Sequence, residues 1–106
     1  MSIGDFYVWK RNQVNNCKGP FRFSIAEIQT DLYQENEQVY ISAAGYNPSC
    51  LEIRKKNNDL LVGKVPSSYA HIWDCIRNGW FYSGKIFCVY GNQHGIVPYV
   101  EFVGRK

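Results

Sequence analysis

The side chains that could hold a metal ion are few and scattered. His71 and Cys75 have a spacing that suits two ligands, because residues four apart share one face of a helix. No second pair of ligands lies near them in the sequence. A polar flank of a helix is therefore the simpler interpretation, and we expect neither a metal site nor a cofactor.

Nucleophilic and acid-base chemistry also lacks a motif. No Gly-x-Ser-x-Gly turn frames a serine, and the nine glycines are too dispersed to form a phosphate-binding loop. The carboxylates Glu35, Glu37, Glu52 and Glu101 each suit a solvent-facing loop or strand position. We therefore expect that the protein is not an enzyme.

Binding is better indicated than catalysis. Tyr46 and Asn47 lie in a turn between two expected strands, where an aromatic ring is not needed for a core. Basic residues recur near the expected strand ends and alternate with tyrosines: Arg22, Arg54, Lys55, Lys56, Lys64 and Lys85, with Tyr40, Tyr46, Tyr82 and Tyr90. Proteins that bind single strands use this combination, because rings stack on bases and cations follow phosphates. The alternative is that the tyrosines belong to the core and the lysines to a solvated face.

The four cysteines, Cys17, Cys50, Cys75 and Cys88, include no C-x-x-C pair, which excludes a zinc ribbon and a thioredoxin-like motif. Cys88 lies in an apolar run that is typical of a buried thiol. Four cysteines could in principle form two disulfides. We expect reduced, buried thiols instead, and hence a cytoplasmic location.

Composition limits the fold. The chain has 106 residues, of which 45% are hydrophobic and 16% aromatic, with a net charge of +3. This length favours one domain, and the mild charge allows a nucleic-acid partner without requiring one. No apolar run approaches the roughly 18 residues of a membrane-spanning helix, and the first residues do not resemble a signal peptide. We expect a soluble protein with no membrane contact.

Short strands are expected throughout, because apolar residues alternate with polar ones between frequent Gly and Pro residues. The expected strands are residues 6–9, 21–29, 38–43, 50–54, 60–65, 80–90 and 96–103. Gly84 is expected to mark a bulge or bend in the long stretch from 80 to 90. Residues 67–77 instead have the apolar spacing of an amphipathic helix.

These elements predict a mainly β fold: a small antiparallel β-barrel of SH3-like or OB-like size, with one α-helix inserted before the last two strands. Aromatic residues are expected to fill its core, including Phe21, Phe23, Trp73, Phe87 and Phe102.

Three stretches in the same order resemble the HIRAN domain, a small barrel of fork-remodelling translocases and of stand-alone bacterial and phage proteins. They are residues 46–53, residues 61–66 leading into the helix, and the closing pair of strands at 79–91 and 96–103. The resemblance runs from Phe21 to Val103, so we expect a barrel domain over residues 21–106 and an N-terminal extension with a short aromatic strand over residues 1–20.

The resemblance implies binding of single-stranded DNA, notably at a free 3′-hydroxyl end. It implies that Tyr46 stacks on the terminal base and that Asn47 meets the terminal hydroxyl group or base edge. Lys64 and Ser67 would hold phosphate near the start of the helix, and Gln29 and Thr30 would line the other side of the pocket. The alternative is a protein-interaction module, for instance a phage or mobile-element protein that inhibits a host enzyme.

Overall fold

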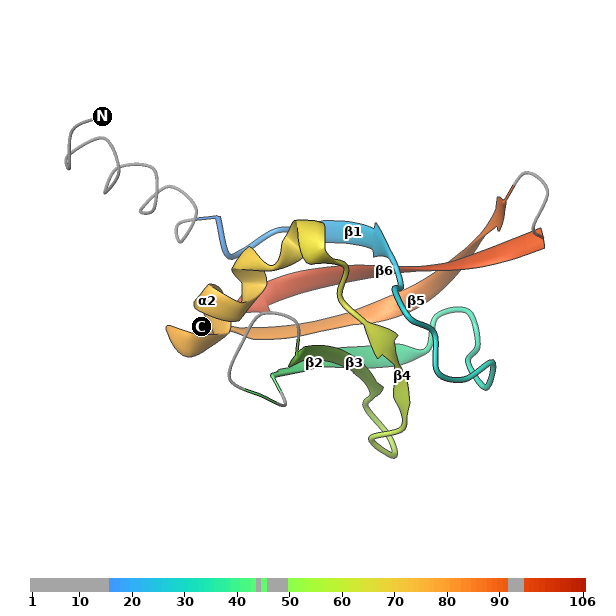
Figure 1. Cartoon of the computed structure of the whole chain (residues 1–106), viewed down its shortest axis with the longest axis horizontal. Helices are drawn as coiled ribbons and strands as arrows, with labels where there is room; N and C mark the ends of the chain where they lie inside the picture. The colour runs from blue at the N-terminus through green and yellow to red at the C-terminus, as the bar shows by residue number, and fades with distance from the viewer. Residues whose placement is uncertain (1–15, 44, 46–49, 92–94) are drawn as a thin grey trace.

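The computed structural model describes residues 16–43, 45, 50–91 and 95–106, and within these it contains six strands and a short helical segment (Figure 1). The strands are β1 (Phe21–Ser24), β2 (Gln38–Ala43), β3 (Leu51–Lys55), β4 (Leu61–Lys64), β5 (Phe81–Gly91) and β6 (Gly95–Arg105). A 3-10 turn, η2 (Ser67–Tyr69), and helix α2 (His71–Arg77) lie between β4 and β5.

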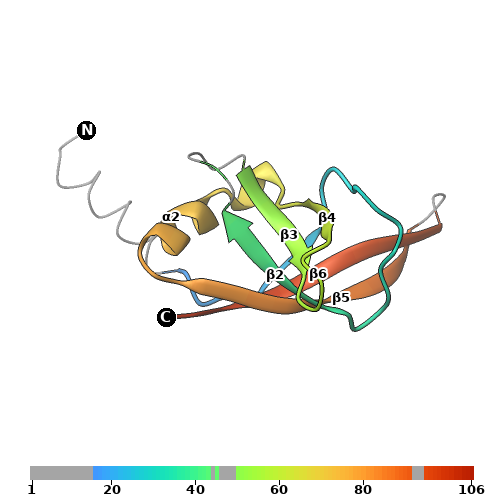
Figure 2. The same ribbon diagram turned by 90° about the horizontal axis from the view of Figure 1, so that it is seen from below.

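All strand pairs are antiparallel, and the strands form one sheet in the order β1-β6-β5-β2-β3-β4. The sheet curls, so that β2 and β3 cross the long β5 and β6 (Figure 2). Just beyond β1, Ala26 pairs with Lys64 of β4 and brings the two edges of the sheet together. The predicted mainly β fold, a small curled antiparallel sheet with one helix before the last two strands, is confirmed.

Alternating residues on each strand form the core. Phe21 and Phe23 of β1 and Phe102 of β6 are buried, and Val39, Ile41, Ile53 and Ile86 fill the middle of the curled sheet. Their spacing of two residues puts them on one face of each strand. Trp73 packs partly buried against this core, whereas Phe87 does not belong to it. The prediction that Phe87 is a core residue is therefore wrong.

The helical segment covers the end of the sheet where the C-terminus lies (Figures 1 and 2). Its buried residues are Ile72 and Cys75. The predicted helix over 67–77 is interrupted, because the first three residues form a 3-10 turn and α2 begins at His71. The side chain of Asn78 donates a hydrogen bond to the carbonyl oxygen of Asp74, 2.8 Å away, and the chain leaves the helix at Gly79 with φ of 96°.

Strand β1 is shorter than the predicted strand over 21–29. Its pairing with β6 ends at Ser24 and Tyr99, and the next residue of β6 toward its start is Pro98. Proline has no N–H group to donate to the ladder. The chain accordingly leaves β6 and pairs with Lys64 at Ala26.

Gly84 allows β5 and β6 to approach closely. A Cβ atom at this position would lie 1.8 Å from the carbonyl oxygen of Glu101. The pairing of β5 with β6 runs from Phe81 to Gly91 without a shift in register, so the bulge predicted at Gly84 is wrong.

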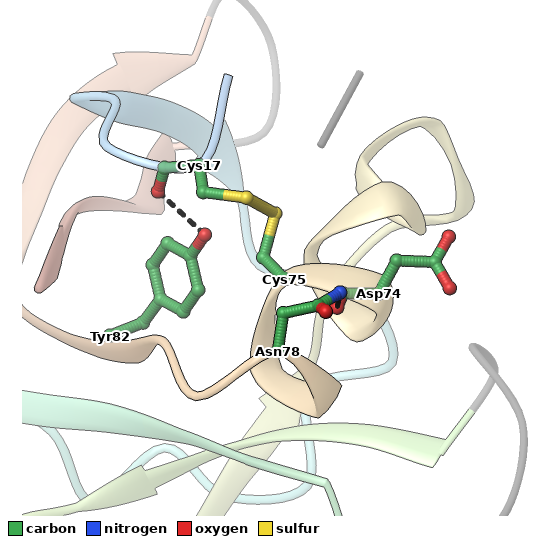
Figure 3. Close-up of a disulfide and its surroundings, with 5 residues drawn as sticks. All are labelled: Cys17, Asp74, Cys75, Asn78 and Tyr82. Atoms are coloured by element: carbon green, nitrogen blue, oxygen red, sulfur yellow. Dashed lines mark hydrogen bonds between the residues drawn. A yellow bond between two sulfur atoms is a disulfide. The ribbon is translucent and has the colours of Figure 1, made fainter. Parts of the chain in front are cut away.

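Two of the four cysteines form a disulfide, which corrects the prediction of reduced thiols. Cys17 and Cys75 are 58 residues apart in sequence and are both fully buried (Figure 3). The bond joins the segment before β1 to α2, where Tyr82 also donates a hydrogen bond to the carbonyl oxygen of Cys17. Residues 1–15 lie outside the described part of the chain, so the predicted N-terminal extension and its strand over 6–9 stay predictions.

Among the described residues, no helix is both long and apolar enough to cross a membrane.

Candidate functional site

Two of the residues predicted to bind DNA lie near the edge where β4 meets the chain beyond β1. The backbone N–H group of Gln29 donates to the carbonyl oxygen of Val62, 2.8 Å away. Lys64 exchanges two backbone hydrogen bonds with Ala26, and its ammonium nitrogen is 3.9 Å from a carboxylate oxygen of Glu27. The neighbouring carboxylate offsets the positive charge that a phosphate would need.

The other predicted site residues add little to this edge. The hydroxyl oxygen of Thr30 accepts a hydrogen bond from the backbone N–H group of Leu32. Ser67 is exposed in η2, where no side-chain cap is formed, so it is not at the start of the α-helix. Tyr46 and Asn47 lie outside the described residues, and their predicted roles stay predictions.

The side of the sheet that faces away from the core carries a different set of residues. We call the part of this side on β5 and β6 the outer face. Strand pairing arranges its residues in four rows across β5 and β6: Phe87 with Tyr99, Lys85 with Glu101, Ser83 with Val103, and Phe81 with Arg105. The row of Lys85 and Glu101 continues to Arg22 of β1 and Gln38 of β2.

Aromatic rings lie at both ends of the outer face. The rings of Phe87 and Tyr99 are stacked, with centroids 5.9 Å apart and planes inclined by 28°. The guanidinium group of Arg22 lies 5.6 Å from the centroid of Phe87, within the range of a cation-π contact. At the opposite end Phe81 is 75% exposed, an unusual position for a large apolar ring.

A shallow groove of about 320 Å³ lies between the two aromatic ends. Its walls include Lys56, Lys85 and Arg105, together with the polar side chains of Gln38 and Ser83. Within the described part of the chain, none of the three basic side chains lies within 4.0 Å of a carboxylate oxygen. The groove is therefore suited to an anionic group.

Glu101 is the carboxylate that lines this groove, and its negative charge is largely taken up by Arg22. The two residues face each other across β1 and β6 and form an ion pair. By contrast, the basic residues farther along the sheet are already paired. Arg54 binds the carboxylate of Glu52, and the buried Lys55 lies 3.2 Å from Glu37.

The tyrosines predicted to interleave with the basic residues are distributed differently. Tyr82 is buried, and burial raises its pKa to about 12. Tyr40 donates a hydrogen bond to Asp59, and this bond raises the pKa of Tyr40. Neither hydroxyl group is available to a ligand on the outer face.

His71 and Cys75 do not form a metal site, because the sulfur of Cys75 is in the disulfide. The ring of His71 packs edge-on against Phe21, with centroids 5.4 Å apart. Its buried Nε2 atom has no hydrogen-bond partner among the described residues, and burial lowers the pKa of His71. In the described residues no group of three or more His, Cys, Asp or Glu side chains could hold a metal ion.

Sequence reasoning named Arg22, Lys56 and Lys85 among the basic residues near strand ends, but it missed Phe81, Phe87, Tyr99 and Arg105. A signal was present in β5, where Phe81, Ser83, Lys85 and Phe87 alternate with Tyr82, Gly84 and Ile86. The polar Ser83 and the charged Lys85 mark the solvent side of the strand. Phe87 is two residues beyond Lys85, so its side chain belongs on the same side of the strand.

Comparisons with protein-family models, with curated proteins and with solved structures found no match for this chain. The resemblance to the HIRAN domain therefore stays a hypothesis that rests on the three sequence stretches.

Proposed function

We propose that the protein is a module that binds single-stranded DNA through the outer face of β5 and β6. The observation that carries this proposal is the stacked pair of Phe87 and Tyr99, with Arg22 over the ring of Phe87, beside a groove lined by three basic side chains. Phe87 and Tyr99 are half-buried rings on the solvent side of the sheet, where aromatic rings provide stacking surfaces for bases, and the basic groove provides contacts for phosphates.

Single strands suit this surface better than a duplex. A base can stack on Phe87 or Phe81 only when its own face is accessible, as it is in an unpaired strand. The net charge of +3 favours a polyanion without making binding depend on charge alone.

The proposal is tested by fluorescence anisotropy with a labelled oligothymidylate at about 50 mM salt. We expect saturable binding that weakens as salt is raised. Phe87→Ala should weaken binding by about tenfold, since stacking on an aromatic ring contributes about 1–3 kcal/mol per base. No binding of any single-stranded oligonucleotide at this salt concentration would overturn the proposal.

Two lysine variants separate the outer face from the site predicted from the sequence. Lys85→Ala removes a charge from the groove, whereas Lys64→Ala removes one from the edge beside Glu27. If DNA binds to the outer face, Lys85→Ala should lower the affinity and Lys64→Ala should change it little. The reverse result would move the site to the edge of β4 and leave DNA binding in place.

Recognition of a 3′ end is the finer part of the proposal. It is supported by the sequence resemblance, through Tyr46 and Asn47. The same oligonucleotide with a free or a blocked 3′-hydroxyl group provides the test, and a preference for the free end is expected. Equal affinities would leave binding of single strands and remove recognition of the end.

A protein-interaction module is the second candidate. The segment between β1 and β2 exposes two aliphatic side chains, Ile28 at 47% and Leu32 at 67%, and exposed aliphatic side chains favour protein contacts. A protein partner that remains bound after nuclease treatment, and that is lost in Leu32→Asp, would favour this candidate.

The cytoplasmic location expected from the sequence depended on reduced thiols. The disulfide between Cys17 and Cys75 removes that support, since such bonds persist in oxidising compartments. Labelling of thiols in the source cells tests the location. Accessible Cys17 and Cys75 after denaturation would favour the cytoplasm, and protected cysteines an oxidising compartment.

A further inference from the structure

Both aromatic ends of the outer face place an arginine near a phenylalanine ring. At one end, Arg22 lies over the ring of Phe87. At the other end, Arg105 is directly opposite Phe81 in the pairing of β5 with β6. A flat ring beside a guanidinium group can take a base and the phosphate next to it, so each end is a complete contact for one nucleotide.

The distance between these ends follows from the strand geometry. Phe81 and Phe87 are six residues apart on β5, on the same side of the sheet, so they lie about 20 Å apart at about 3.4 Å per residue. Stacked nucleotides advance about 3.4 Å each along one strand, and an extended backbone advances farther. A strand that is more extended than a fully stacked one covers this span in fewer than six steps, that is, with about four to six nucleotides.

The residues between the ends differ in kind. Lys85 and Ser83 lie between Phe87 and Phe81 on β5, and Lys56 and Gln38 complete this part of the groove. These side chains offer hydrogen bonds and charge, but no ring on which a base could stack. The middle of the face is thus suited to phosphates, and the bases there face solvent.

We propose that a tract of about four to six nucleotides lies lengthwise along β5 and β6, with one base on the pair of Phe87 and Tyr99, another on Phe81, and the intervening phosphates in the groove. This inference rests on the proposed binding of single-stranded DNA. It adds the length of the tract, its direction along the strands and the positions at which bases are recognised.

The test is a series of oligothymidylates from two to twelve nucleotides, measured by fluorescence anisotropy. Affinity should rise steeply until the oligonucleotide reaches both rings, at about six nucleotides, because the second contact is then made within one complex. Beyond that length it should rise only in proportion to the number of overlapping sites. Removal of the two central bases of a six-nucleotide strand should change affinity less than about threefold, whereas removal of the two terminal bases should lower it about tenfold or more.

Phe81→Ala supplies a second measurement. Its side chain is exposed, so the variant should fold like the wild type, which circular dichroism checks. The variant should lose the gain in affinity between about three and six nucleotides. The matched control is Leu32→Ala, which removes another exposed apolar side chain, far from β5 in sequence. This control should keep the gain in affinity between about three and six nucleotides.

The outcomes separate this inference from the proposed function. The twelve-nucleotide strand could bind although affinity shows no steep rise at about six nucleotides, or although Phe81→Ala has no effect. Either result overturns the proposed tract and leaves the binding of single strands in place. Equal losses from central and terminal abasic positions also overturn it. Failure of the longest strand to bind overturns both.

Discussion

The hydroxyl group of Tyr82 on β5 donates a hydrogen bond to the backbone carbonyl oxygen of Cys17, 2.6 Å away in the interior. The donor and acceptor are 65 residues apart in sequence. The bond lies beside the disulfide of Cys17 with Cys75, so a hydrogen bond and a covalent bond both hold the segment before β1 (Figure 3).

Tyr82→Phe should lower the free energy of unfolding by about 1 kcal/mol, because the buried hydrogen bond from Tyr82 to the carbonyl oxygen of Cys17 is lost. Burial raises the pKa of Tyr82 from 10.0 to about 12, so the folded protein keeps the phenolic proton at pH values where the unfolded chain loses it. The resulting stabilisation is complete below pH 10 and declines between pH 10 and about 12. Urea unfolding below and above pH 10 checks this, because the free energy of unfolding should fall more in the wild type than in the variant.

Reduction of the disulfide should lower the free energy of unfolding by about 4 kcal/mol, because a bond that closes a loop of 58 residues restricts the unfolded chain. Urea unfolding with and without reductant measures this difference. Replacement of both Cys17 and Cys75 by serine should have a similar effect. Cys88→Ser, which leaves the disulfide in place, is the control, and its response to reductant should match that of the wild type.

Glu101→Gln should raise the affinity for single-stranded DNA severalfold, because it removes the carboxylate that lines the groove and leaves the positive charge of Arg22 unbalanced. The free energy of unfolding should change by less than about 1 kcal/mol, since the ion pair with Arg22 is solvent-exposed on the arginine side. Glu52→Gln, whose partner is Arg54, serves as the control and should not alter affinity. A fall in affinity for Glu101→Gln would contradict this prediction. It would mean that Glu101 helps binding more by holding Arg22 over the ring of Phe87 than it hinders binding by repelling phosphate.

The salt dependence of binding should identify the residues that contact phosphates. Removal of one phosphate contact from a single-strand complex reduces the slope of log affinity against log salt by about 0.7. Lys85→Ala and Arg105→Ala should each show this reduction, because both side chains line the groove. Phe87→Ala should lower affinity at every salt concentration with little change in slope. Unchanged slopes in both basic variants would exclude phosphate binding in the groove.

The stability of the protein should fall in mild acid because of His71. Burial lowers its pKa from 6.5, despite the opposite influence of Asp74, so the unfolded chain binds the proton more readily than the folded protein. The stabilisation is therefore complete above pH 6.5 and is lost as the pH falls through the lowered pKa. His71→Phe keeps a ring against Phe21 without a titrating group. Urea unfolding at about pH 5 and pH 7 should show a smaller acid loss in this variant than in the wild type.

Local patterns in the sequence predicted most of the fold. The alternation of Phe21, Arg22 and Phe23 is enough to predict one buried side of β1, and the stripe of Ile72 and Ile76 predicts a helix. The disulfide could not be predicted in this way. Cys17 and Cys75 meet because the segment before β1 passes over α2, which is a property of the tertiary arrangement.

The candidate site was predicted less well, because it depends on which side of a long strand faces the core. Ile86, Phe87 and Cys88 are all apolar, so composition alone does not determine the orientation of Phe87. The structure buries Ile86 and places Phe87 against Tyr99 on the opposite side. The pairing of Phe87 with Tyr99 depends on the register of two strands, and the sequence of either strand by itself does not contain it.

The position of the disulfide relative to the strand order has a consequence for folding. The loop between Cys17 and Cys75 contains β1 to β4, whereas β5 and β6 follow it in sequence and yet lie between β1 and β2 in the sheet. Arg22 on β1 thus meets a partner, Glu101, that is 79 residues away. Pairing of such distant residues is slow, because the intervening chain has to be ordered first. We expect insertion of the hairpin of β5 and β6 between β1 and β2 to be the slowest step in folding.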